Sequence, residues 1–125
     1  MGVVSGELEK YLKKLIKTIE TQASFSFGNK KIVNKTRIDD ILCCIDVNFP
    51  EILKRFLKEY GTDKNVRCFK IYEKLIANIK IKPLLGNDSY AVNYNEVSAL
   101  IPQLKESIET DVNYVQRTYA GLQDN

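Results

Sequence analysis

Hydrophobic positions recur every three or four residues along most of the chain. From Glu7 to about Thr21 they form one stripe, with lysines on the opposite side. This spacing places apolar side chains on one face and predicts an amphipathic α-helix. The same pattern predicts further helices that begin near Thr36 and near Pro50, span about 64–80, and occupy about 93–99 and 102–119. We expect Pro102 to separate the last two, because proline inside a helix costs about 3 kcal/mol.

Two stretches lack this helical spacing. In residues 22–35, Phe25 and Phe27 alternate with serines before the turn sequence Gly28-Asn29, which predicts a small β-hairpin. Residues 84–93 are rich in turn formers and predict an irregular loop. We therefore expect an all-α fold: a single compact domain over 1–125 with five or six helices, room for the small hairpin after the first helix, and frayed ends at about 1–6 and 120–125.

The composition is that of a globular protein, with 44% hydrophobic and 28% charged residues among 125. No apolar run reaches the length of about eighteen residues that a transmembrane helix needs. The first residues carry neither the apolar segment nor the cleavage site of a secretory signal. The adjacent Cys43 and Cys44 point about 100° apart on a helix, so they are poorly placed to share a disulfide or a metal. We expect a reduced, cytoplasmic protein without metal or other cofactor.

Catalytic chemistry has little support in the sequence. The chain has no histidine, which removes the usual general base and the Ser-His and Cys-His dyads. The carboxylates Asp39 and Asp40 fall in a predicted first helical turn, where acids interact favourably with the helix dipole. Residues 86–89 lack the glycine spacing and the lysine of a phosphate-binding loop. We therefore expect no catalytic residues and no enzyme activity.

Charge is distributed unevenly along the chain. Residues 1–82 hold 17 of the 19 Lys and Arg residues and 10 of the 16 Asp and Glu residues, whereas residues 83–125 are net acidic. Tyrosines also lie in this acidic third, and an acidic, aromatic surface suits a basic protein partner. We therefore predict a non-catalytic protein-binding protein, in its narrowest form an immunity protein or antitoxin that neutralises a toxin, for example a nuclease, by covering its basic site. The residues expected to contact the partner are Asp88, Tyr90, Glu106, Glu109 and Tyr114.

The alternative is a small helical nucleic-acid-binding or regulatory protein. The turn at residues 47–50 joins two predicted helices as in a helix-turn-helix. The basic residues expected to face outward are Lys54, Arg55, Lys58, Arg67, Lys70 and Lys74. However, the second helix would begin with Pro50 and Glu51, which are poor at reading base edges. This alternative therefore predicts only weak, sequence-independent phosphate contacts.

Overall fold

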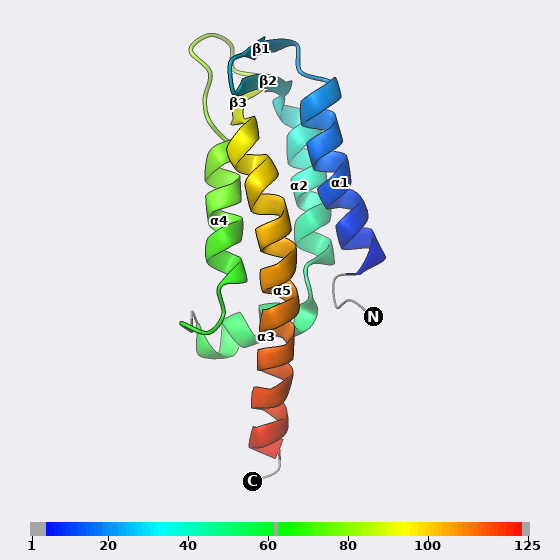
Figure 1. Ribbon diagram of the computed structural model, residues 1–125, viewed down its shortest axis with the longest axis vertical. Coiled ribbons are helices and arrows are strands. Elements are labelled where there is room, and N and C mark those ends of the chain that lie inside the picture. Colours follow the sequence, from blue (N-terminus) through cyan, green and yellow to red (C-terminus); the bar gives the residue numbers. More distant parts are fainter. Residues whose placement is uncertain (1–4, 62, 124–125) are drawn as a thin grey trace.

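Helices form most of the chain and a small sheet covers one end of them. The computed structural model describes residues 5–61 and 63–123. In chain order the elements are α1 (Gly6–Thr21), β1 (Phe25–Phe27), β2 (Lys30–Asn34), α2 (Lys35–Asn48), α3 (Glu51–Tyr60), α4 (Cys68–Ile79), β3 (Ser89–Asn93) and α5 (Tyr94–Gln123). Helices α1, α2, α4 and α5 run along the long axis, whereas α3 crosses them at the end opposite the sheet (Figure 1). The expected all-α class is therefore wrong, because the fold is mostly helical but mixed α and β.

The sheet is antiparallel, with strand order β1-β2-β3. The hairpin expected after the first helix is present. Its turn has Gly28 at φ +60° followed by Asn29 at negative φ, the pattern of a type II′ turn. Residues 84–88 are irregular as expected, but residues 89–93 form strand β3, which pairs with β2, Tyr90 lying opposite Val33. A five-residue strand whose partner is far away in the sequence has too short a local pattern to be separated from the turn formers around it.

Helix α5 is continuous through Pro102, so the break expected there is wrong. The proline ring is exposed, whereas Val97, Ile101, Leu104 and Ile108 are buried on either side of it along the helix. Burying a side chain of this kind contributes about 1.5–3 kcal/mol. Together these four contributions exceed the cost of about 3 kcal/mol for one proline. Packing therefore holds the helix together across a residue that disfavours it.

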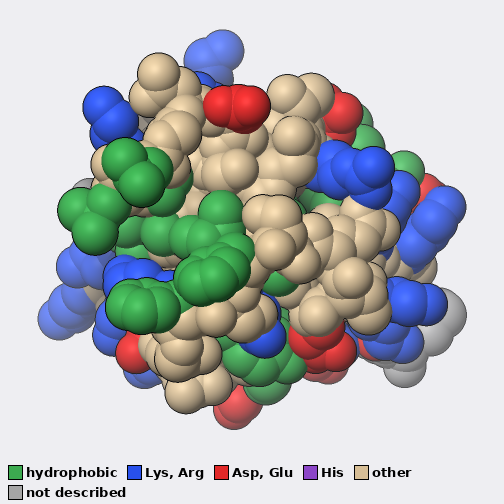
Figure 2. Space-filling model, turned by 90° about the horizontal axis from the view of Figure 1, so that it is seen from above, with side chains coloured by type: hydrophobic (Ala, Val, Ile, Leu, Met, Phe, Trp, Pro, Cys, Tyr) green, Lys and Arg blue, Asp and Glu red, His purple; other side chains and the backbone are tan. Residues whose placement is uncertain are grey.

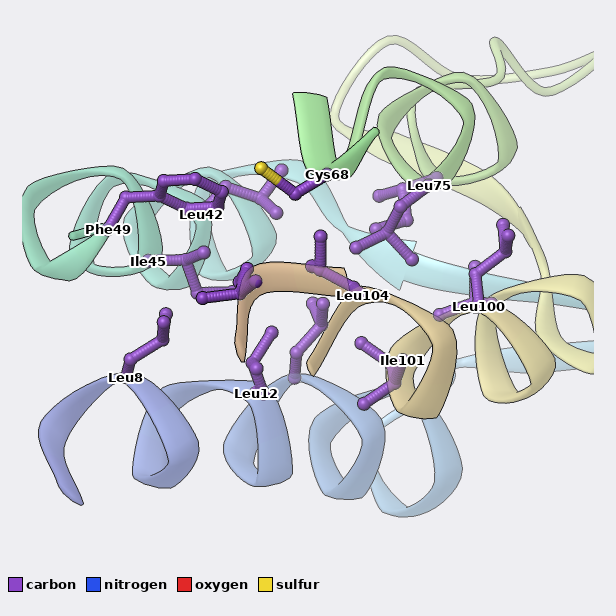
Figure 3. Packing of buried hydrophobic residues seen from close by; sticks show 14 of the residues in the cluster. Leu8, Leu12, Leu42, Ile45, Phe49, Cys68, Leu75, Leu100, Ile101 and Leu104 are labelled. Carbon is purple, nitrogen blue, oxygen red and sulfur yellow. The ribbon is translucent and has the colours of Figure 1, made fainter. Parts of the chain in front are cut away.

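The buried apolar side chains form one cluster among the helices and the inner face of the sheet. On α5, Ile101 points towards α1, whereas Leu104 points towards the side of Leu42 and Cys68 (Figure 3). Four residues of the stripe predicted for the first helix are fully buried: Leu8, Leu12, Leu15 and Ile19. Helical spacing predicts that Cys68 lies on the apolar side of the helix expected at about 64–80, and it is buried as predicted. The same spacing predicts that Tyr60 ends the apolar stripe of the preceding helix and lies in the core, but it is half exposed.

The start of α4 is capped by a side chain from another helix. The carboxylate of Asp111, on α5, accepts hydrogen bonds from the backbone N–H groups of Arg67 at 3.0 Å and Cys68 at 2.8 Å. These donors have no partner within their own helix, because the first turn of any helix leaves its N–H groups free. Helix α4 therefore begins at Cys68, later than the start near residue 64 that apolar spacing predicts.

The start of α5 is capped in the same long-range manner, by the hairpin turn. The backbone oxygen of Asn29 accepts a hydrogen bond from the N–H of Tyr94 at 3.0 Å. Its side-chain Oδ1 accepts another from the N–H of Asn95 at 2.6 Å, and its Nδ2 donates to Glu96 at 2.6 Å. The hairpin is thereby fixed to the first turn of the longest helix.

The two ends of the described chain are helical. Helix α1 begins at Gly6, where Ser5 Oγ accepts a hydrogen bond from the N–H of Leu8 at 3.1 Å. Helix α5 continues to Gln123 and so extends into the range where we expected fraying. The other expected frayed residues, 1–4 and 124–125, lie outside the described residues. No described helix combines the length and the hydrophobicity needed to cross a membrane.

Candidate functional site

The five residues expected to contact a partner lie in two separate places. Asp88 and Tyr90 are at the sheet end, directly before and within β3. Glu106, Glu109 and Tyr114 follow one another along α5. A helix rises about 1.5 Å per residue, so Tyr114 lies about 30 Å along α5 from its first residue. These residues therefore do not form a single contact surface.

Tyr90 belongs to the core and not to the surface. Its side chain is 9% exposed, and its hydroxyl donates a hydrogen bond to Asp39 Oδ1 at 2.7 Å. Burial, followed by this hydrogen bond to a carboxylate, raises the pKa of Tyr90 to about 12. Almost none of the side chain is left for a partner to contact, so its expected role as an exposed anchor does not fit its position.

Glu106 and Tyr114 are near a polar groove between α5 and the turn that precedes α4. The groove has a volume of about 420 Å³, and Glu106 lines it together with Lys64 and Arg67. Tyr114 is half-buried beside it, and its hydroxyl donates to Asp63 Oδ2 at 3.0 Å. Both signs of charge are present around this groove, so the region is polar without being acidic.

Residues from the acidic third pair with residues from the basic part of the chain. Lys105 of α5 places its Nζ 3.0 Å from Glu9 Oε1 of α1. This hydrogen bond and charge interaction hold the pKa of Glu9 below its usual value. Glu109, farther along α5, faces solvent. The acidic third is therefore tied to α1 through its lysine, while its acids Glu106 and Glu109 stay exposed on α5.

Some basic residues proposed for phosphate contact already have partners in the protein. Lys54 lies 3.4 Å from Glu51, and Arg55 lies 3.6 Å from Glu59. The guanidinium of Arg55 also stacks over the ring of Tyr119, 4.4 Å from its centroid. Lys58, Arg67, Lys70 and Lys74 are exposed. The face of α3 is thus partly neutralised by its own acids.

The cysteines and the adjacent carboxylates Asp39 and Asp40 are the candidate catalytic groups, and their surroundings are typical of structural residues. Burial, and then the nearby Asp111 carboxylate, raise the pKa of the Cys68 thiol strongly, which keeps it protonated. Cys43 is exposed and Cys44 half-buried, both as free thiols. Of the adjacent carboxylates, Asp39 accepts the hydrogen bond of Tyr90 and Asp40 faces solvent. Within residues 5–61 and 63–123, no three His, Cys, Asp or Glu side chains are grouped so that they could hold a metal ion.

Large apolar side chains are exposed together at the sheet end of the molecule. Phe25 and Phe27 of β1 are 61% and 69% exposed, while Leu84 is fully exposed and Leu85 91% exposed on the loop before β3. We call these four residues the sheet-end surface. Seen from this end, hydrophobic side chains gather on one side, with Lys and Arg side chains next to them (Figure 2). Contiguous exposed apolar groups of this kind mark interaction sites.

The pairing of the strands explains why the two phenylalanines face outward. Successive side chains of a strand point to opposite faces of the sheet. Val33 and its partner Tyr90 are buried on the inner face, so Ile32 and its partner Phe25 lie on the outer face. Phe27 shares that outer face, and the two phenyl rings stack with their centroids 6.4 Å apart.

Backbone hydrogen bonds hold both parts of the sheet-end surface in place. The hairpin that carries the phenylalanines is fixed to α5 through Asn29. The leucine loop is fixed at its two ends, where the N–H of Ala91 donates to the oxygen of Ile81 at 2.8 Å and the N–H of Lys35 donates to the oxygen of Asp88 at 2.7 Å. The anchored ends limit the conformations of this surface before any partner binds.

Sequence reasoning did not identify the sheet-end surface as a candidate site. The alternating phenylalanines and the adjacent leucines are visible in the sequence, but the strand that connects these two segments is not. Comparisons with family models, curated proteins and solved structures find no match for this chain. The function has to be inferred from the surfaces described above.

Proposed function

We propose that this protein is a non-catalytic binding protein, that its ligand is another protein, and that it binds through the sheet-end surface. The observation that carries the proposal is the grouping of four exposed apolar side chains from two separate segments. Aromatic residues are enriched at protein interfaces, and monomeric proteins rarely leave large apolar groups together in water. Binding of this kind requires a complementary surface and no catalytic residue.

The energetics of such an interface can be bounded. Full burial of a Leu or Phe side chain contributes about 1.5–3 kcal/mol, so four of them contribute on the order of 6–12 kcal/mol. Loss of translational and rotational freedom on association costs about 4–15 kcal/mol. The two ranges overlap, so apolar burial at this surface roughly offsets the cost of association. Polar and charged complementarity around the apolar groups must then set the affinity.

An alternative form of the binding function is the immunity protein or antitoxin expected from the sequence, which would cover the basic site of a toxin with its acidic residues. It is supported by the exposed acids of the C-terminal third: Asp88 beside the sheet-end surface, and Glu106 and Glu109 on α5. The cytoplasmic location belongs to the same proposal. The exposed thiol of Cys43 suits a reducing compartment, where thiols are not converted to disulfides.

Co-purification of tagged variants from the native host tests which surface binds. A sheet-end variant, Phe27→Ser with Leu85→Ser, should lose the protein that wild type retains. Its matched control is Val47→Ser with Leu122→Ser, which removes exposed apolar side chains elsewhere and should retain that protein. Loss of at least one interface anchor should weaken binding about tenfold or more, which corresponds to about 1.4 kcal/mol.

Charge reversal on α5 and on the basic helices completes this experiment. If Glu106→Lys with Glu109→Lys alone abolishes co-purification, the interface is the α5 face and the antitoxin form is favoured over the sheet-end surface. If nucleic acid is recovered with wild type, and only Lys58→Glu with Lys70→Glu changes its recovery, the nucleic-acid-binding alternative predicted from the sequence replaces the proposal. Retention of the partner by the sheet-end variant would contradict the proposal directly.

A further inference from the structure

Lysines without carboxylate partners lie around the sheet-end surface. Lys30 occupies the cross-strand position beside Phe27, and its Nζ donates to Asn93 Oδ1 at 3.0 Å. Lys82 is exposed two residues before Leu84. Lys31 lies on the other face of the sheet, where its Nζ donates to Ser26 Oγ at 3.3 Å. In the part of the chain that the structure describes, none of these three ammonium groups forms an ion pair, whereas Lys13, Lys54 and Lys105 on the helices do.

Most carboxylates at the same end are held against donors of the protein itself. Glu96 accepts the hydrogen bond from Asn29, which lowers the pKa of Glu96. Asp39 accepts from Tyr90 and lies 4.0 Å from the ammonium of a lysine, Lys80. On the leucine loop, Asp88 is exposed and its side chain faces water. Lys82 and Asp88 are both exposed and neither forms an ion pair with another described residue, whereas Lys30 is half-buried and its charge also helps to lower the pKa of Glu96. The two lysines next to the apolar side chains, Lys30 and Lys82, nevertheless outnumber Asp88, the acid exposed on the leucine loop.

We infer that the partner presents apolar side chains flanked by aspartate or glutamate. This inference rests on the proposed function, because it describes the partner of the same surface. The sign of the charge on the partner is then opposite to the one expected from the sequence, in which the acidic third of the chain covers a basic partner. Carboxylates placed opposite Lys30 and Lys82 would complement these charges at the rim while the apolar groups are buried at the centre.

The polar groups between the apolar side chains favour a protein over a lipid bilayer. Asn93 lies on the outer face of the sheet in the same cross-strand row as Phe27 and Lys30. Strand β1 is also an edge strand, so its outer side carries backbone N–H and C=O groups with no neighbouring strand. Hydrocarbon cannot hydrogen-bond to these groups, whereas a protein chain can.

Selection from a phage-displayed library of short random peptides tests the inference on the full chain. The immobilised wild-type protein is the target, and a Phe27→Ser, Leu84→Ser variant serves for counter-selection. Peptides that require the surface should be enriched in apolar residues flanked by Asp or Glu. For one such synthetic peptide, fluorescence anisotropy should show that Lys30→Glu with Lys82→Glu weakens binding about tenfold or more. The control, Lys14→Glu with Lys58→Glu, makes the same change in net charge elsewhere and should leave binding within about twofold.

The outcomes separate this inference from the proposed function. Surface-dependent peptides flanked by Lys or Arg would show that the partner is not acidic, while binding of protein at this surface would stand. Enrichment that is the same on wild type and variant, or no enrichment, would overturn both. Vesicles of phosphatidylcholine with and without phosphatidylglycerol provide a further arm, in which surface-dependent sedimentation without peptide binding would replace the protein partner with a membrane. Circular dichroism melts of each variant confirm that it is folded.

Discussion

Removal of the Asp111 carboxylate should destabilise this protein more than removal of any exposed acid. Asp111 is 1% exposed on α5, and it caps the first turn of α4 by accepting hydrogen bonds from Arg67 and Cys68. Asp111→Ala leaves both backbone donors without their acceptor, and the bond from Cys68 is buried while that from Arg67 is part-buried. The contact joins two helices that are far apart in the sequence, so its loss affects the packing of the helices as well as one cap.

The magnitude follows from the two hydrogen bonds. A hydrogen bond to a charged group contributes about 1.5–3 kcal/mol, and a buried donor left unpaired costs about 1–3 kcal/mol. Against this, the variant no longer has to bury a carboxylate, which offsets part of the loss. We expect a net cost of about 2–4 kcal/mol for Asp111→Ala. In a domain of this size that corresponds to a fall in Tm on the order of 10 °C.

Urea unfolding followed by circular dichroism measures this cost. Glu109→Ala is the matched control, because it removes an exposed acid from the same helix and should change the free energy of unfolding by less than about 0.5 kcal/mol. Asp111→Asn keeps an acceptor oxygen and should fall between the two. Hydrogen exchange adds a local readout, since the amides of Arg67 and Cys68 should lose protection first in Asp111→Ala. Equal stability of Asp111→Ala and Glu109→Ala would refute the capping role.

Three further predictions concern single side chains. Asn29→Ala should lower the free energy of unfolding by about 1–2 kcal/mol, because α5 loses its cap; an unchanged urea midpoint would contradict this. Pro102→Ala should raise the urea midpoint, and the free energy of unfolding should rise by up to about 3 kcal/mol, because proline is unfavourable inside a helix. A lower midpoint would show that Pro102 does not destabilise the protein. Burial and the bond to Asp39 raise the pKa of Tyr90 from 10 to about 12, so the folded state holds this proton more tightly than the unfolded state. That contribution is complete below about pH 10 and is lost as pH rises towards 12, so urea midpoints for Tyr90→Phe should depend less on pH in this range than those of wild type; parallel curves would refute it.

Local interactions made most helices predictable, whereas long-range ones did not. The stripe of Leu8, Leu12 and Leu15 is visible because helical neighbours are three or four residues apart, and its burial is confirmed. The start of α4 depends instead on Asp111, which lies 44 residues from Arg67 and 43 from Cys68. Likewise β3 is stabilised by its pairing with β2, which only the folded chain brings together. A pattern of hydrophobic residues over a short stretch of sequence contains only one partner of each of these interactions, so it cannot predict them.

The tyrosines show the same limitation at the candidate site. The sequence placed Tyr60 in the core and Tyr90 on the surface, and the structure reverses both. Tyr60 is the last residue of α3, so its apolar stripe extends past the end of the core. Tyr90 lies in a strand whose alternate residues face inward, which is not apparent while residues 84–93 are read as a loop. Errors in secondary structure thus became errors in the choice of contact residues.

The sign of the charge that a partner meets depends on neighbours in space and not on the net charge of a segment. Helix α5 carries most of the acidic third, but it packs against α1 and α4, whose exposed faces carry lysines. One of its few basic residues, Lys105, pairs with an acid of the basic part, Glu9. A base and an acid that are far apart along the chain thus come side by side at this contact. At the sheet end Lys30 lies beside the exposed Phe27, and Lys82 precedes the exposed Leu84, and on this basis we infer an acidic partner where the linear sequence favoured a basic one.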